Sequence, residues 1–133
     1  MTEEQTGTLE TTYTPIPTGD YKGIIKDVQA GSTPNGNAKL DVIWLIDDEG
    51  VREHTGMEEP TCKQTVWLDV DANNRLEMGQ NKNIGLGKLR DALGQNDGSP
   101  WSPTMLMGQP AMVYIEPDKK TGQYSNVTQV APA

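Results

Sequence analysis

The sequence has no phenylalanine, and only one cysteine and one histidine among its 133 residues. Cys62 alone cannot form an internal disulfide, and His54 alone cannot supply the paired ligands that usually hold zinc or iron. No apolar run is long enough to cross a membrane as a helix, and no segment resembles a signal peptide. We therefore expect a cytoplasmic protein with no cofactor, no metal ion and no membrane contact.

Aliphatic residues are also scarce: Leu, Ile and Val together make up 24 of 133 residues, about 18%. With a net charge of −8, this fraction is close to the range in which chains stop folding. Three Trp, four Tyr and six Met supply further apolar bulk, and the length suits one domain with one modest core. We expect a disordered, acidic, Thr-rich leader over residues 1–18 and one folded domain over residues 19–131.

The negative charge is unevenly distributed along the chain. Residues 1–21 carry a charge of −4 and residues 47–59 carry −5, whereas the remainder is close to neutral. This excess of acid excludes a protein that coats duplex DNA through a broad basic face. It leaves room for a local basic surface outside the two acidic segments.

Five segments have the composition and the alternation of β-strands. They span residues 19–28, 39–47, 62–70, 110–116 and 123–130. In the second segment, apolar residues fall on one face at a period of two, and Trp44 is among them. We therefore assign Trp44 to the core. Residues 48–60 are acidic and contain two glycines, which indicates an irregular loop.

The period becomes helical between residues 83 and 93, with Asn83 as a candidate N-cap and Gly94 as a left-handed stop. The resulting order is β-β-β-α-β-β. It predicts an all-β domain with one helix, arranged as a five-stranded OB-fold-like Greek-key barrel. A partly open sheet packed by one helix has the same order and remains an alternative.

The stretch around Gly85-Leu86-Gly87-Lys88 resembles a phosphate-binding loop, but its spacing is wrong. Gly79 and Gly85 are separated by five residues instead of four, and no Ser or Thr follows Lys88 to bind magnesium. Arg90 also stands where a dinucleotide fingerprint requires its third glycine. We expect Gly85 and Gly87 to allow the first helical turn to approach the barrel closely.

Residues 69–75 imitate the first half of a calcium loop, but Gln80 stands where the bidentate carboxylate belongs. An Asx-rich turn explains this segment better than a metal site does. The single histidine also leaves no Ser–His–Asp or Cys–His arrangement to assemble. The sequence therefore predicts that the protein is not an enzyme.

The remaining candidate surface combines aromatic and basic side chains. Trp67 is predicted to lie on the polar face of the third strand with Lys63, a combination that single-stranded nucleic acid uses for base stacking and phosphate contact. The candidate nucleic-acid-binding residues are Trp67, Lys63, Lys39, Lys22, Tyr114, Lys82 and Lys88. A second interpretation remains open, in which Trp67 covers the helix or the acidic loop.

Six segments of the chain resemble a family of small bacteriophage proteins described as single-stranded DNA-binding proteins. They are PIPTGDYKGIIKDV, AKLDVIWLID, QTVWLDV, KNIGLGKLRDALGQN, WSPTMLMGQPAMVYI and YSNVTQVAP. The resemblance covers residues 15–131. It implies an OB fold, single-stranded DNA as the ligand, and a role in phage DNA replication and recombination in the cytoplasm of an infected bacterium. Further partners would be other copies of the chain and phage or host replication proteins.

A different class of function suits the same composition. A virion or assembly protein that uses a small β-barrel as an adhesive module would also be acidic and poor in aliphatic residues. Such a protein would form oligomers that depend on the leader, and it would have no affinity for nucleic acid.

Overall fold

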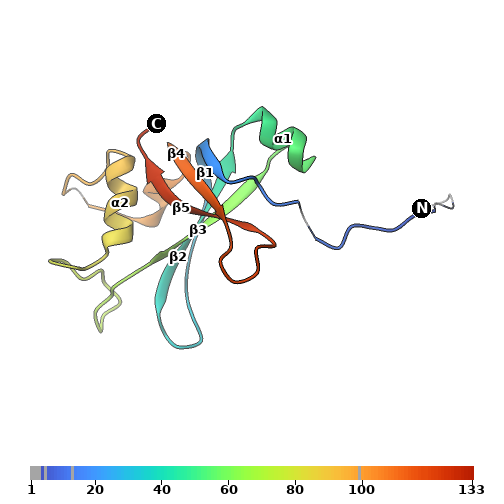
Figure 1. The fold of residues 1–133 in the computed structure, drawn as a ribbon. Helices are drawn as coiled ribbons and strands as arrows, with labels where there is room; N and C mark the ends of the chain where they lie inside the picture. Colours follow the sequence, from blue (N-terminus) through green and yellow to red (C-terminus); the bar gives the residue numbers. More distant parts are fainter. Residues whose placement is uncertain (1–3, 5, 13, 99) are drawn as a thin grey trace.

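A computed structural model describes residues 4, 6–12, 14–98 and 100–133, and within them the chain forms five strands and two short α-helices (Figure 1). The elements, in chain order, are β1 (Gly19–Ser32), β2 (Ala38–Ile46), α1 (Glu49–Thr55), β3 (Thr61–Trp67), α2 (Ile84–Ala92), the 3₁₀ turn η1 (Pro103–Leu106), β4 (Pro110–Pro117) and β5 (Ser125–Ala131). All five predicted strands are present, with bounds that differ from the prediction by a few residues.

The strands close into a barrel in the order β1-β2-β3-β5-β4, with β4 returning to β1. Neighbouring strands are antiparallel except for β3 and β5, which run parallel and pair only at Lys63 and Asn126. The prediction of an all-β barrel is therefore confirmed, and the alternative of a partly open sheet is wrong.

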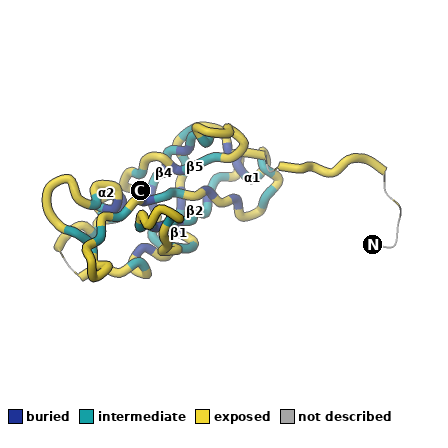
Figure 2. The backbone as a smooth tube through the Cα atoms, turned by 90° about the horizontal axis from the view of Figure 1, so that it is seen from below, coloured by how far each residue is buried: buried dark blue, intermediate teal, exposed yellow. Residues whose placement is uncertain are grey.

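The core fills the barrel through alternate residues of its strands, and Figure 2 shows buried and less buried segments alternating along them. Trp44 on β2 is fully buried, as predicted. Its indole Nε1–H donates a hydrogen bond of 2.9 Å to Oε1 of Gln64 on β3, so the one polar group of this ring is satisfied. Gly23 on β1 leaves the space that the Trp44 ring occupies, since a Cβ atom there would lie 2.9 Å from Trp44 Cε3.

Helix α2 packs against β3 and β5 through two buried leucines, Leu86 and Leu89. It ends as predicted at Gly94, which has a φ of 71°. The Gln95 N–H donates to the Arg90 carbonyl at 2.8 Å and the Gly94 N–H to the Asp91 carbonyl at 3.1 Å, which is the Schellman pattern. Neither helix in the described part of the chain is long and apolar enough to span a membrane.

The prediction that Asn83 caps α2 is wrong, because its side chain makes no capping hydrogen bond. Asn83 has a left-handed backbone (φ 52°), and its side chain points to the preceding loop. Its Oδ1 accepts from the Asp69 N–H at 2.8 Å, and its Nδ2 donates to the Asp69 and Glu77 carbonyls at 3.0 and 2.9 Å. Asn83 therefore closes the base of the loop between β3 and α2.

The prediction of an irregular loop over residues 48–60 is also wrong, because α1 forms inside it. The Asp48 side chain accepts from the Val51 N–H at 2.9 Å, and Gly56 ends the helix with a φ of 72°. Val51 is buried, and Arg52 donates to Asp47 at 2.8 Å, which lowers the pKa of that carboxyl group. The order of elements is therefore β-β-α-β-α-β-β, with one helix more than predicted.

The described part of the leader extends away from the barrel on the side of α1, opposite to α2 (Figures 1 and 2). Ile16 is nevertheless buried, and its carbonyl accepts a hydrogen bond of 2.8 Å from the Ser125 hydroxyl. Packing on the barrel therefore begins at Ile16, before the predicted boundary at residue 19. The predicted disorder of the leader stays a prediction, and residues 1–3, 5 and 13 lie outside the described residues.

Candidate nucleic-acid interface

The outer surface of β2 and β3 brings three of the predicted site residues together. Cross-strand neighbours there are Lys39 and Trp67, Asp41 and Thr65, and Ile43 and Lys63. We call these six residues the β2–β3 face. The alternation of β3 explains the arrangement, because Cys62 and Val66 point into the core and leave their neighbours outside.

Trp67 is 56% exposed, and it lines one groove with Gly85 and Lys88 of α2. Helix α1 precedes the first residue of β3, whereas Trp67 is the last residue of that strand. A large aromatic ring with this exposure has a free face on which another planar group can stack. The prediction that Trp67 lies outside the core is therefore confirmed, and its role in binding stays a prediction.

Next to Trp67, the barrel wall opens into a groove between β3, β5 and α2. The groove is lined by residues 64–67, Gly85, Lys88 and residues 126–130, and we call it the seam groove. It exists because β3 and β5 pair at a single position and then separate. Its lining is about equally polar and apolar, and Lys88 from α2 is its one charged residue among those described.

Lys39 forms an ion pair with a carboxylate of the same face. Its Nζ lies 3.1 Å from Oδ2 of Asp41, and Oδ1 of Asp41 accepts from the Thr65 hydroxyl at 3.1 Å. Asp41 thus places a carboxylate in the middle of the β2–β3 face, where it repels phosphate. Lys39 remains beside Trp67, but Asp41 weakens it as a phosphate ligand.

Lys63 and Lys88 are both exposed, and neither forms an ion pair with any described residue. Lys63 pairs with Asn126, whose side chain donates to Asp118 of the hairpin between β4 and β5 at 3.1 Å. That hairpin also carries Lys119 and Lys120, which sequence reasoning did not include. A Lys-Lys pair in a turn that leads directly to β5 was the signal that could have identified them.

Asp118 lies in the same turn as these two lysines, and the turn holds its carboxylate by hydrogen bonds. The backbone N–H groups of Lys120 and Thr121 donate to Oδ2 at 3.2 and 3.1 Å. These hydrogen bonds, first that of Thr121, lower the pKa of Asp118. Asp118 therefore stays ionised, and the hairpin carries two exposed lysines and one carboxylate.

Lys22 lies away from the β2–β3 face, so the structure does not bring it to Trp67. Its neighbour Gly23 pairs with Ile46 of β2. Ile46 is seven residues from Lys39 along the same strand, so these two residues are roughly 23 Å apart. The Nζ atom of Lys22 also lies 3.9 Å from Oδ2 of Asp47, close to the start of α1. The sequence could not reveal this separation, since it depends on the register of β1 against β2.

Tyr114 is on the outer surface of β4, where it pairs with Gln129 of β5. Because β5 stands between β4 and β3, Tyr114 does not belong to the β2–β3 face. It lies next to the seam groove, since Gln129 is part of the groove lining.

Lys82 lies in the loop before α2, and its Nζ is 2.9 Å from Oε2 of Glu77. The contact with Glu77 raises the pKa of Lys82 and keeps it charged. Lys82 lines a second groove, and Lys88 is shared between this groove and the seam groove. The predicted site residues are thus divided between the β2–β3 face, the two grooves beside α2, and distant positions.

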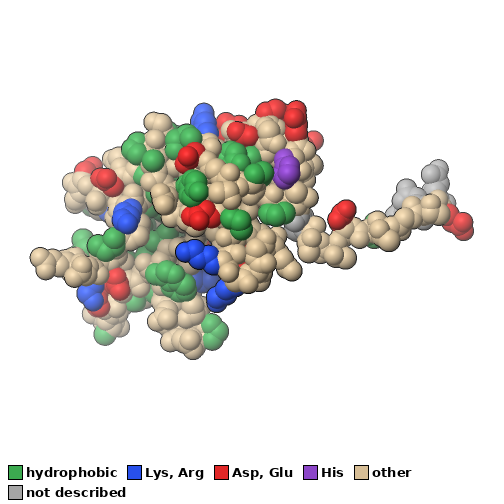
Figure 3. Space-filling model, in the orientation of Figure 1, with side chains coloured by type: hydrophobic (Ala, Val, Ile, Leu, Met, Phe, Trp, Pro, Cys, Tyr) green, Lys and Arg blue, Asp and Glu red, His purple; other side chains and the backbone are tan. Residues whose placement is uncertain are grey.

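Figure 3 shows basic side chains beside a hydrophobic side chain in the middle of the molecule, over β2 and β3, and acidic side chains gathered around α1.

Among the described residues, no group of three or more His, Cys, Asp or Glu could hold a metal ion. A Cβ atom added at Gly85 would lie 3.7 Å from Val66 Cγ1, an ordinary contact, and one added at Gly87 would meet no atom within 4 Å, so the expectation that these glycines are needed for close approach of α2 is wrong. No protein-family model matches the chain, and no curated protein is significantly similar to it.

Proposed function

We propose that the barrel is an OB fold. The strand order β1-β2-β3-β5-β4 supports this assignment, as does the parallel pairing of β3 and β5 that closes the barrel. The position of α2 between β3 and β4 supports it further, since the helix packs on the barrel through Leu86 and Leu89. OB folds bind oligonucleotides on the surface of strands 2 and 3 and on the loops beside it.

We further propose that the protein binds single-stranded DNA with little sequence preference, in a binding role and not an enzymatic one. The observation that carries this proposal is the 56% exposure of Trp67 on β3, directly opposite Lys39. A base stacked on such a ring contributes about 1–3 kcal/mol, and every base has a face that can stack. Lys63 and Lys88 provide phosphate contacts on either side, and Lys119 and Lys120 of the hairpin between β4 and β5 are further exposed cations.

The net charge of −8 predicts modest affinity for each protomer, because the whole molecule repels a polyanion. Only the basic groups close to Trp67 offset this repulsion, so binding weakens steeply with salt. Several protomers bound along one strand would raise the overall affinity. This behaviour suits the role in phage DNA replication and recombination that the family resemblance implies.

The experiment that tests the proposal is a titration of fluorescently labelled oligo-dT with the full chain, at low and at high salt. We expect binding at low salt that weakens as salt rises, and weaker binding to a duplex of equal length. Failure to bind oligo-dT at low salt would contradict the proposal. If the chain then formed oligomers that disappear on removal of residues 1–14, the assembly role would take its place.

A further inference from the structure

A second groove runs along the other side of α2 from the seam groove. It lies between α2, the loop that precedes this helix, and residues 96, 98, 100 and 101 after it, and we call it the α2 groove. Its lining contains four basic residues, Arg75, Lys82, Lys88 and Arg90, and two acidic residues, Glu77 and Asp91. In a chain of net charge −8, this excess of positive charge is local to the groove.

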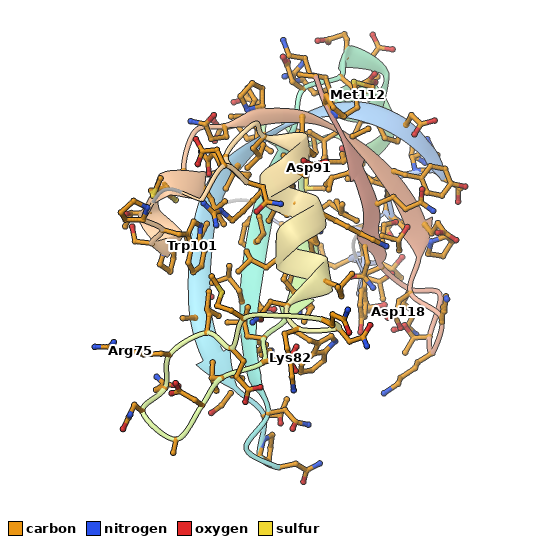
Figure 4. All side chains as sticks on the ribbon, turned by 90° about the vertical axis from the view of Figure 1, so that its left-hand side faces the viewer. Arg75, Lys82, Asp91, Trp101, Met112 and Asp118 are labelled. Carbon is orange, nitrogen blue, oxygen red and sulfur yellow. The ribbon has the colours of Figure 1, made fainter. Side chains whose placement is uncertain are left out.

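The loop that carries two of these cations is held in place by specific hydrogen bonds. Asn83 ties the loop to Asp69 and Glu77, as described above. The Arg75 N–H donates to Oδ1 of Asp71 at 3.0 Å, which closes the Asx-rich turn predicted for this segment. Figure 4 shows Lys82 beside the first turn of α2, and Arg75 on the same side of the helix as Trp101. These bonds fix the backbone of the loop before any ligand binds, and the Lys82 ammonium group is paired with Glu77 at 2.9 Å.

The opposite wall of the groove is formed by Arg90 and Trp101. The Arg90 guanidinium carbon lies 5.8 Å from the centre of the Trp101 ring, and Nη2 donates to the Gln95 carbonyl at 2.6 Å. Arg90 Nε and Trp101 Nε1 have no hydrogen-bond partner among the described residues, although both atoms are buried. Oε1 of Gln95, an acceptor, is likewise buried and unpaired among the described residues, so both donors and an acceptor are left unsatisfied at this wall.

Lys88 connects the two grooves, because it lines both of them from the exposed side of α2. A strand that stacks on Trp67 and contacts Lys88 has therefore reached the entrance of the α2 groove. We propose that the α2 groove is a second subsite for single-stranded DNA, in which Arg75 and Lys82 contact phosphates of the nucleotides that follow those bound at Trp67. The inference rests on the proposed function and adds to it a path around α2.

A single strand fits the groove better than a protein partner does. The groove meets the seam groove at Lys88, the seam groove shares Thr65 and Trp67 with the β2–β3 face, and the excess charge of the α2 groove is positive. The exposed apolar side chains at its edge, Met78 and Ile84, offer surface to unstacked bases. An acidic peptide could use the same charges, and the experiment below separates the two ligands.

The test measures affinity for oligo-dT as a function of length, from about 4 to about 16 nucleotides, which are typical site sizes of OB folds. The variant is Arg75→Gln/Lys82→Gln in the full chain. The control is Lys22→Gln/Lys26→Gln, which removes equal charge next to α1 and Glu59, far from both grooves. Thermal unfolding of each variant verifies that the fold is intact.

We expect the groove variant to bind the shortest oligonucleotides as wild type does and to lose affinity only for long ones. For long oligonucleotides, the slope of log affinity against log salt should fall in magnitude by about 1.4, or about 0.7 for each lost phosphate contact. Unchanged binding at every length, or an equal loss at every length and in the control, would overturn the subsite. Binding of an acidic peptide that the variant alone loses, with DNA binding unchanged, would assign the groove to a protein. Failure of the wild type to bind any oligonucleotide would instead overturn the proposed function.

Discussion

Lys39 and Trp67 lie directly opposite each other on β2 and β3, and the charge of Lys39 is shared with Asp41, 3.1 Å away. An exposed indole, an ammonium group and a carboxylate thus occupy one small area of the barrel surface. The indole and the ammonium group favour a nucleotide, whereas the carboxylate opposes one. Asp41 is the only acidic residue among the six residues of the face, so its substitution tests how strongly this carboxylate opposes binding of a nucleotide.

We predict that Asp41→Asn tightens binding of oligo-dT. The substitution removes the negative charge from the face and frees Lys39 for phosphate, while an amide oxygen can still accept from Thr65. The salt dependence of log affinity should become steeper by about 0.7, the value for one further phosphate contact on a single strand. Glu59→Gln is the matched control, because it frees Lys26 at a distant site, and it should leave binding unchanged. Weaker binding by Asp41→Asn would contradict our placement of the strand.

Gly23→Ala should destabilise the barrel by about 1–3 kcal/mol, as overpacking of a core does. The added Cβ would lie 2.9 Å from Trp44 Cε3 and 3.4 Å from both Val113 methyl groups, and the fully buried indole has no room to move. Gly31→Ala on the same strand is the control, since a Cβ there meets no atom within 4 Å. Chemical denaturation measures both, and equal stabilities would show that the core accommodates the methyl group.

Asn83→Ala should lower the free energy of unfolding by about 2–3 kcal/mol. It removes three side-chain hydrogen bonds and places alanine in a left-handed conformation. Asn83→Gly loses the same bonds without the backbone strain, so it should be about 1 kcal/mol more stable than Asn83→Ala. The exposed residue Asn73 of the same loop offers a control, because its backbone N–H donates to Oδ1 of Asp71 and this bond survives Asn73→Ala. If Asn83→Ala matched that control in denaturation experiments, Asn83 would not hold the loop.

Cys62 should react slowly with thiol reagents in the folded protein. Burial raises the pKa of this thiol to about 12, so only about one molecule in ten thousand carries the thiolate at pH 8. The ordinary pKa of the thiol is 9.0, so the folded state holds this proton more tightly than the unfolded state does. The free energy of unfolding should therefore fall as the pH rises above about 9. The fall should be smaller in Cys62→Ala. Rapid labelling of the native protein at pH 8, at a rate independent of denaturant, would contradict this assignment.

The sequence predicted the strands and the barrel because apolar and polar residues alternate along each strand, which gives each strand one apolar face. Trp44 could be assigned to the core on this basis, and Gly94 could be identified as a helix stop from its chemistry alone. Helix α1 was missed because only Val51 is buried along its seven residues, which is too few to establish a helical period. Asp48 and Gly56 were its local signals, as the residues before and after it.

The candidate site was harder to predict, because it depends on register and on partners distant in sequence. The alternation of β3 was sufficient to place Trp67 and Lys63 on the outer surface. The distance of Lys22 from Trp67 follows from strand pairing, which no local pattern reveals. In the same way, Asn83 has the composition of a cap but bonds to Asp69, fourteen residues earlier in the chain.

The most direct test of the proposed function compares the affinity of three Trp67 forms for labelled oligo-dT at low salt. Trp67→Ala should bind roughly 5- to 150-fold more weakly than wild type, as expected for the loss of about 1–3 kcal/mol of stacking. Trp67→Phe should retain most of the affinity, because its ring can still stack. Met107→Ala, which truncates an exposed apolar side chain outside both grooves, should bind as wild type does. Wild-type affinity in Trp67→Ala would contradict the proposal that this ring carries the interface.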